Sequence, residues 1–148
     1  MASKPPNGDV CRLSDGALPE DVVRKILELK VIAVVGLSPK PERPSHYVSE
    51  YLREHGYKIV PVNPGHKEIL GEACYPSVAA IPFSVDVVCV FRRPEEALAP
   101  ILEAIAAKAK AVWLQDGVYH DEGERMARAA GLLVVSNDCM MRRHARAR

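Results

Sequence analysis

The feature that most constrains the fold is the apolar run at residues 31–36, Val-Ile-Ala-Val-Val-Gly, which is followed by turn residues and then by a helical pattern. A short run that is rich in β-branched residues and ends in glycine is typical of a parallel strand buried on both faces. The helical pattern opens with Pro44 and Ser45, which suit a first turn. The sequence therefore predicts a strand–loop–helix unit whose helix N-terminus and loop N–H groups can receive a phosphate.

The loop in this unit departs from the usual dinucleotide motif. The pattern G-x-G-x-x-G would place glycines at positions 38 and 41, where this chain has Ser38 and Pro41. Lys40 and Arg43 add two cations beside the expected phosphate position. The loop favours a phosphorylated ligand, but not specifically NAD.

Apolar runs and helical patterns alternate along the rest of the chain. We expect helices at 19–29, 44–55, 94–107 and 121–130, and strands at 31–36, 57–62, 84–91, 110–115 and 132–135. In the helix at 44–55, Tyr47, Val48, Tyr51 and Leu52 form one apolar face. This alternation predicts a single Rossmann-like, doubly wound α/β domain: a five-stranded parallel sheet in the order 3-2-1-4-5, with helices on both faces.

The two ends of the chain differ from the middle in composition. Residues 1–18 mix Pro, Gly, Ser and Asp, and we expect a flexible segment there, followed by the domain at 19–144 and a basic tail at 145–148. The basic run 142–148 is most simply a solvated, frayed end, with a phosphate or nucleic-acid contact as the alternative.

Charge, hydropathy and cysteine spacing exclude several classes of protein. The net charge of +1 gives no general attraction to nucleic acid or to a membrane surface. No apolar stretch approaches the ~20 residues that span a bilayer, and no signal peptide is evident, so we expect a cytoplasmic protein. The four cysteines include no C-x-x-C pair, and no metal site is expected.

The residues that follow the strands are the candidate ligand contacts, because open parallel sheets bind ligands at the carboxyl ends of their strands. Asn63 stands where an NAD site would carry Asp or Glu, and Arg92 and Arg93 follow the third strand. A missing carboxylate together with added cations suits a ligand with a further phosphate, such as coenzyme A or NADP. The alternative for the arginines is a surface ion pair with Glu95 or Glu96.

No set of catalytic residues converges in the sequence. His46 lies in the first helical turn, where its imidazole either contacts phosphate or packs. Cys139 follows the fifth strand with no adjacent base, so the sequence favours a structural thiol, although this position would also let the thiol of coenzyme A form a reversible mixed disulfide with it. Cys89 is expected in the core.

Five ordered motifs resemble the small stand-alone CoA-binding proteins, a family related to the N-terminal domain of the succinyl-CoA synthetase α subunit. The motifs lie at 36–46, 62–64, 69–72, 91–93 and 111–117, and the resemblance covers roughly residues 20–144. The chain departs from the family pattern at Asn137 and Asp138, which precede Cys139, and at Arg143, where an acidic residue before His144 is usual.

The resemblance implies binding of coenzyme A or an acyl-CoA, by a binding or regulatory module without catalytic residues. The phosphohistidine and the nucleotide-binding partner domain of the ligases have no counterpart in this sequence, and an unidentified protein partner stays open. The alternative is an NADP-linked oxidoreductase or another nucleotide-binding enzyme. From the strand ends and the resemblance together, the candidate ligand-binding residues are Gly36, Leu37, Ser38, Lys40, Arg43, His46, Val62, Asn63, Lys67, Phe91, Arg92, Arg93, Gln115 and Gly117.

Overall fold

The computed structural model describes residues 19–147, and the expected flexible segment at 1–18 lies outside this range. The helices are α1 (Pro19–Leu27), α2 (Pro44–Glu54), α3 (Leu98–Ala106), α4 (Asp121–Ala129) and α5 (Met140–Ala147), with short 3₁₀ turns η1 (Val78–Ala80) and η2 (Pro94–Glu96). The strands are β1 (Val31–Val35), β2 (Lys58–Val62), β3 (Glu68–Ile69), β4 (Glu72–Ala73), β5 (Val87–Val90), β6 (Ala111–Leu114) and β7 (Leu133–Val135).

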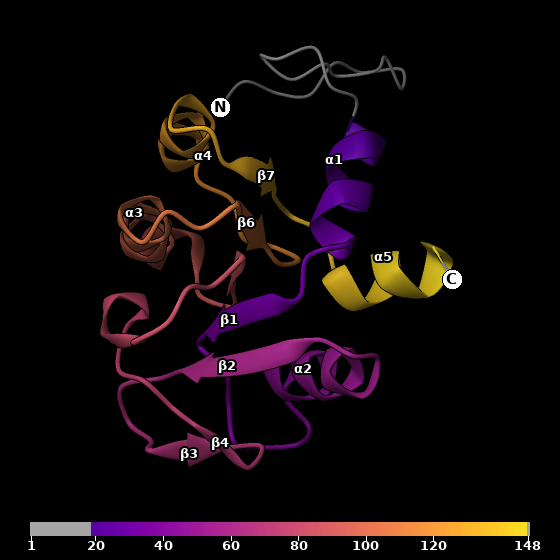
Figure 1. Cartoon of the computed structure of the whole chain (residues 1–148), viewed down its shortest axis with the longest axis vertical. Helices are drawn as coiled ribbons and strands as arrows, with labels where there is room; N and C mark the ends of the chain where they lie inside the picture. Colours follow the sequence, from indigo (N-terminus) through magenta and orange to yellow (C-terminus); the bar gives the residue numbers. More distant parts are fainter. Residues whose placement is uncertain (1–18, 148) are drawn as a thin grey trace.

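Five strands form one parallel sheet with helices on both faces, which confirms the predicted fold class (Figure 1). Side chains of β1 alternate between the two faces. Ile32 and Val34 pack with α1, α2 and α5, whereas Ala33 and Val35 pack with η1, α3 and α4. β1, β2, β5 and β6 are buried over most of their length, as the continuous apolar runs predict, whereas the edge strand β7 is only partly buried.

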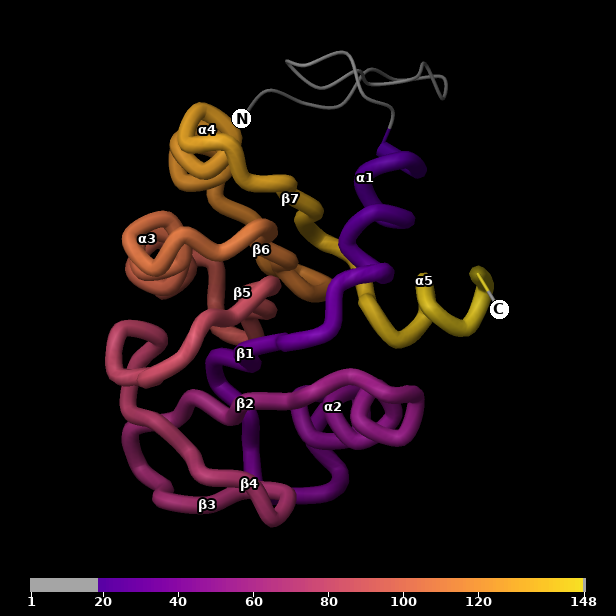
Figure 2. The backbone as a smooth tube through the Cα atoms, in the orientation of Figure 1, coloured from indigo at the N-terminus to yellow at the C-terminus, as the bar shows by residue number. Residues whose placement is uncertain are grey.

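The spatial order of the strands is β2-β1-β5-β6-β7, and Figure 2 shows β5 between β1 and β6. The third long strand therefore lies beside the first, and the order along the sheet is 2-1-3-4-5. The predicted order 3-2-1-4-5, which placed the third strand outside the second, is wrong in this detail.

Pro61 gives the physical reason for this order. Its carbonyl accepts a hydrogen bond of 3.0 Å from the Tyr75 N–H, on the side of β2 that faces away from β1. A proline nitrogen on that side cannot donate to a further full strand, so proline is confined to edge strands. The chain therefore returns across β1 on the face opposite α2, as right-handed crossovers require.

Two elements were not predicted. The segment 65–82, in which no strand was expected, contains the β3–β4 hairpin, whose turn residues Leu70 and Gly71 both have positive φ. The basic run 142–148 was expected to be frayed, but its described part is helical in α5, which continues past residue 144. Within residues 19–147, no helix is both long and apolar enough to span a bilayer.

Candidate functional site

A cleft of about 780 Å³ opens at the carboxyl ends of β1, β5 and β6, between α2 and α5. Its position is the switch point of the sheet, since the chain leaves β1 toward β2 on one side and β5 begins the other half. The lining residues are Gly36, Ser38, Arg43, Pro44, Ser45, Tyr47, Val48, Tyr51, Phe91, Arg92, Gln115, Asp116, Val118, Cys139, Met141, Arg142 and Ala145.

Gly36 forms the floor of the cleft where β1 ends. Its φ is +88°, and its N–H donates to the Val62 carbonyl over 2.9 Å. A Cβ at this position would lie 2.4 Å from the Phe91 carbonyl oxygen. Only glycine satisfies both the backbone conformation and the close approach of the β1 and β5 ends.

The loop between β1 and α2 is closed by its own hydrogen bonds. The Ser38 N–H donates to Ser45 Oγ over 2.9 Å, and the Lys40 N–H donates to Ser38 Oγ over 3.1 Å. His46 Nδ1 lies 2.8 Å from the Ser38 carbonyl, which can only accept, so Nδ1 carries the proton. His46 is buried and is not among the cleft-lining residues.

The predicted cations divide into two groups. Arg43, at the N-cap position of α2, and Arg92, after β5, both line the cleft. Arg93 points to solvent, with its side chain 73% exposed, and pairs with Glu96 at 3.4 Å and Glu95 at 4.0 Å. The surface ion pair is thus observed for Arg93, whereas Lys40 is exposed beside the loop without lining the cleft.

Asn63 does not line the cleft; its side chain connects the loop after β1 to the loop after β2 by hydrogen bonds. Its Nδ2 donates to the Leu37 carbonyl over 3.0 Å, and its Oδ1 accepts from the Gly65 N–H over 3.0 Å. Leu37 and Val62 belong to the core. Two other predicted contacts also lie outside the lining: Lys67 is exposed on the loop before β3, and Gly117 donates its N–H to Asn137 Oδ1 over 2.8 Å.

Gln115 and two cysteines lie where β6 ends. Gln115 lines the cleft and donates from Nε2 to Cys89 Sγ over 3.0 Å. Cys89 is fully buried, as predicted, and burial raises the pKa of its thiol to about 12. Cys139 lines the cleft with 7% of its surface exposed, so it both packs and faces the ligand space.

Helix α5 supplies a wall of the cleft that the sequence did not reveal. Met141, Arg142 and Ala145 lie on it, and Tyr47 and Tyr51 face the same space from α2. Tyr47 and Tyr51 were expected on the apolar face of this helix, and Tyr47 is 44% exposed. One feature of the sequence could have indicated α5: Asp138 and Arg142 have opposite charges and the i,i+4 spacing of a helical pair.

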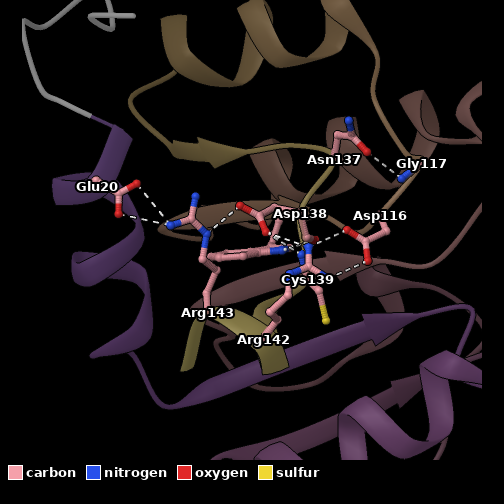
Figure 3. Close-up of polar contacts among 9 residues, drawn as sticks. Glu20, Asp116, Gly117, Asn137, Asp138, Cys139, Arg142 and Arg143 are labelled. Atoms are coloured by element: carbon pink, nitrogen blue, oxygen red, sulfur yellow. Dashed lines mark hydrogen bonds and ion pairs between the residues drawn. The ribbon is translucent and has the colours of Figure 1, made fainter. Parts of the chain in front are cut away.

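A chain of ion pairs fastens α5 to its neighbours, as Figure 3 shows. Arg142 makes two hydrogen bonds to Asp116, of 2.9 and 3.1 Å, and approaches Asp138 at 3.2 Å. Arg143 donates to Asp138 over 2.7 Å and to both oxygens of Glu20 on α1 over 3.1 Å. The hydrogen bonds from Arg142 hold the pKa of Asp116 below its usual range.

Two further contacts set the position of α5. Trp113 Nε1, in the middle of β6, donates to the Asp138 carbonyl over 2.9 Å just before the helix begins. Tyr51 Oη lies 3.0 Å from His144 Nδ1, which joins α5 to α2 across the cleft wall. Among residues 19–147, no group of His, Cys, Asp and Glu side chains is arranged to hold a metal ion.

Comparison with known proteins places this chain in a family. Residues 30–145 match the family model described as a CoA binding domain. The chain is 38% identical over 124 residues to the uncharacterized protein YneT of Bacillus subtilis, covering 83% of this chain and 92% of that protein. It is 30% identical over 116 residues to an ADP-forming acetate–CoA ligase of Archaeoglobus fulgidus, covering 76% of this chain but 17% of the ligase.

A solved structure shows the same fold in a chain of similar length. A hypothetical protein from Pyrococcus horikoshii superposes with a TM-score of 0.84 at 45% identity, over 93% of this chain and 97% of that one. The resemblance drawn from the five motifs is therefore confirmed. The chain belongs to the CoA-binding domain family.

Proposed function

We propose that this chain binds coenzyme A or an acyl-CoA in the cleft between α2 and α5, as a binding or regulatory module without catalytic residues of its own. The observation that carries the proposal is the pair Arg43 and Arg92 in a cleft at the switch point of a CoA-binding-family fold. The two guanidinium groups, the N-terminus of α2 and the Ser38 and Ser45 hydroxyls can together bind a diphosphate.

The closed loop supports a preorganised site. Because Ser38 is already hydrogen-bonded to both Ser45 and His46, the loop needs no large rearrangement to receive phosphate. The hydroxyl protons of Ser38 and Ser45 stay available, since each Oγ accepts in the hydrogen bond observed. Preorganisation reduces the entropy lost when a ligand binds.

The end of β2 argues against NAD. A dinucleotide site needs a carboxylate there to accept from the ribose hydroxyls. In this chain the Asn63 amide is engaged with Leu37 and Gly65. The two cleft arginines would also accept the extra phosphate of NADP, so an NADP-linked oxidoreductase is the competing function.

Isothermal titration with coenzyme A, NAD and NADP distinguishes these functions. We expect coenzyme A to bind most tightly. Tighter binding of either nicotinamide cofactor would reject the proposal in favour of the oxidoreductase.

Arg92 lines the cleft and the adjacent Arg93 does not, so variants of these two residues form a matched pair. Arg92→Ala and Arg43→Ala should each weaken binding of coenzyme A about tenfold, because a charge-assisted hydrogen bond contributes about 1.5–3 kcal/mol. Arg93→Ala, which removes an equal charge one residue away but outside the cleft, should change the Kd less than about twofold. Equal effects of Arg92→Ala and Arg93→Ala would show that only the overall charge matters.

A further inference from the structure

The charged residues that line the cleft are distributed unevenly between its two sides. Arg43 and Arg92 lie at the side formed by the loops after β1 and β5, where Lys40 is also near. The opposite side, formed by the loop after β6 and by α5, contains Asp116, Cys139 and Arg142. Of the described residues that line the cleft, Asp116 is the one carboxylate.

The positive charge of Arg142 is already neutralised. Its guanidinium is shared between Asp116 and Asp138, and Asp138 in turn shares Arg143 with Glu20 (Figure 3). Three carboxylates and two guanidinium groups leave this network with a net charge of −1. Arg142 is therefore a poor anion site, and Asp116 is the one carboxylate that the described lining residues present on this side of the cleft.

This asymmetry orients coenzyme A, and the inference rests on the proposed function. The diphosphate and the 3′-phosphate lie at the nucleotide end of coenzyme A, and the pantetheine arm that ends in the thiol is uncharged. The phosphates are attracted to Arg43 and Arg92, so the thiol end lies toward Asp116 and Cys139. Any acyl group on that thiol would then lie near the Asp116 carboxylate.

We propose that Asp116 is a specificity-determining residue: it makes the cleft select free coenzyme A and uncharged acyl thioesters over thioesters whose acyl group ends in a carboxylate. The Arg142 hydrogen bonds keep Asp116 ionised and hold it at the cleft wall. An acyl carboxylate brought to this wall meets the like charge of Asp116. Repulsion of this kind raises the Kd without requiring a clash.

Butyryl-CoA and succinyl-CoA test this selectivity, because their acyl chains are equal in length and differ at the terminal methyl or carboxylate. We expect succinyl-CoA to bind about fivefold more weakly than butyryl-CoA at low salt, which corresponds to about 1 kcal/mol. The ratio should fall as the salt concentration rises, because exposed charges are screened. A steric cause would leave the ratio unchanged by salt.

Two variants should move the ratio in opposite directions. Asp116→Asn neutralises the network and should bring the ratio close to one. Arg142→Gln leaves Asp116 and Asp138 less compensated and should increase the ratio. Glu122→Gln, which removes a carboxylate on α4 away from the cleft, should leave the ratio as in the wild type. Circular dichroism checks that each variant is folded.

Failure of the inference and failure of the proposed function look different. If neither coenzyme A nor butyryl-CoA binds, the proposed function is wrong. If both bind and succinyl-CoA binds equally well or better in the wild type, the role of Asp116 is wrong while CoA binding stands. A wild-type preference that persists in Asp116→Asn would assign the selectivity to another group.

Discussion

Gly36 is the residue on which the geometry of the cleft depends most directly. Its positive φ turns the chain out of β1, and its missing side chain lets the Phe91 carbonyl approach. Because this contact joins the ends of β1 and β5, it forms the switch point itself. Gly36 thus both allows the ends of β1 and β5 to approach each other and lines the cleft.

Gly36→Ala should lower the free energy of unfolding by about 2 kcal/mol or more, because the left-handed conformation costs about 1–2 kcal/mol for a non-glycine residue and a backbone clash is added. Gly131→Ala is the matched control. Gly131 also has a positive φ, of +93°, but no atom lies within 4 Å of its added Cβ, so only the conformational strain applies. Urea denaturation measures both. Equal losses would mean that the approach of Phe91 does not constrain the site.

Some of the predicted site residues lie together at the cleft because one local motif carries them. The motif at 36–46 identified Gly36, Ser38 and Arg43, which all line the cleft. The sequence could not separate Arg92 from Arg93, because adjacent side chains diverge according to the backbone after β5. It also could not show that His46 and Asn63 are engaged with backbone groups of the loops.

At the scale of the secondary-structure elements, Asp86 connects the starts of β1, β5 and β6. Its carboxylate accepts from the Val31 N–H over 3.0 Å and the Lys30 N–H over 3.3 Å, and Lys110 Nζ lies 3.5 Å away. Burial acts to raise its pKa, but these hydrogen bonds and the ammonium group together lower the pKa below its ordinary value. The ionised carboxylate therefore stabilises the pairing of β1 with β5.

Asp86→Asn should lower the free energy of unfolding by about 1 kcal/mol at pH 7, since a hydrogen bond to a charged group is weakened. A lowered folded-state pKa gives stability that is present above the unfolded value of about 3.9 and lost as the pH falls through the folded value. The difference in free energy of unfolding between wild type and variant should therefore be constant from pH 5 to 7 and disappear toward pH 2–3. A difference of equal size at pH 3 and pH 7 would contradict this role.

Helix α5 is held by Arg143, which contacts Asp138 and reaches Glu20 on α1. Arg143→Gln should lower the free energy of unfolding by about 1 kcal/mol, more than a typical surface pair contributes, because the side chain is only 24% exposed and serves two carboxylates. Arg146→Gln, an exposed position near the end of the same helix, should change it by less than about 0.5 kcal/mol. Thermal unfolding compares them. Equal losses would show that the network adds nothing beyond helix charge.

The elements were predictable where hydrophobic periodicity was strong. All five long strands and the four helices before α5 were expected close to their observed bounds. The strand order was predicted incorrectly, although Pro61 indicates that β2 is an edge strand. Helix α5 was missed because its sequence is dominated by arginine and its stability comes from tertiary partners on α1, α2 and β6.

At the scale of the whole molecule, the cleft combines segments that are far apart in the sequence. The loops after β1 and β5 contribute the cations Arg43 and Arg92, and α5 forms the opposite wall, which the network from Glu20 to Asp116 holds in place. Sequence patterns predicted the half built from strand ends. The other half depends on how α5 packs against α2, which no local pattern encodes.

A crystal structure of the complex with coenzyme A tests the central claim most directly. We expect the ligand in the cleft between α2 and α5, with its phosphates beside Ser38, Arg43 and Arg92 and its thiol toward Cys139. Phosphates located at the α5 side would contradict the orientation. A ligand bound outside this cleft, for example in the shallow groove between η1 and α3, would contradict the site itself.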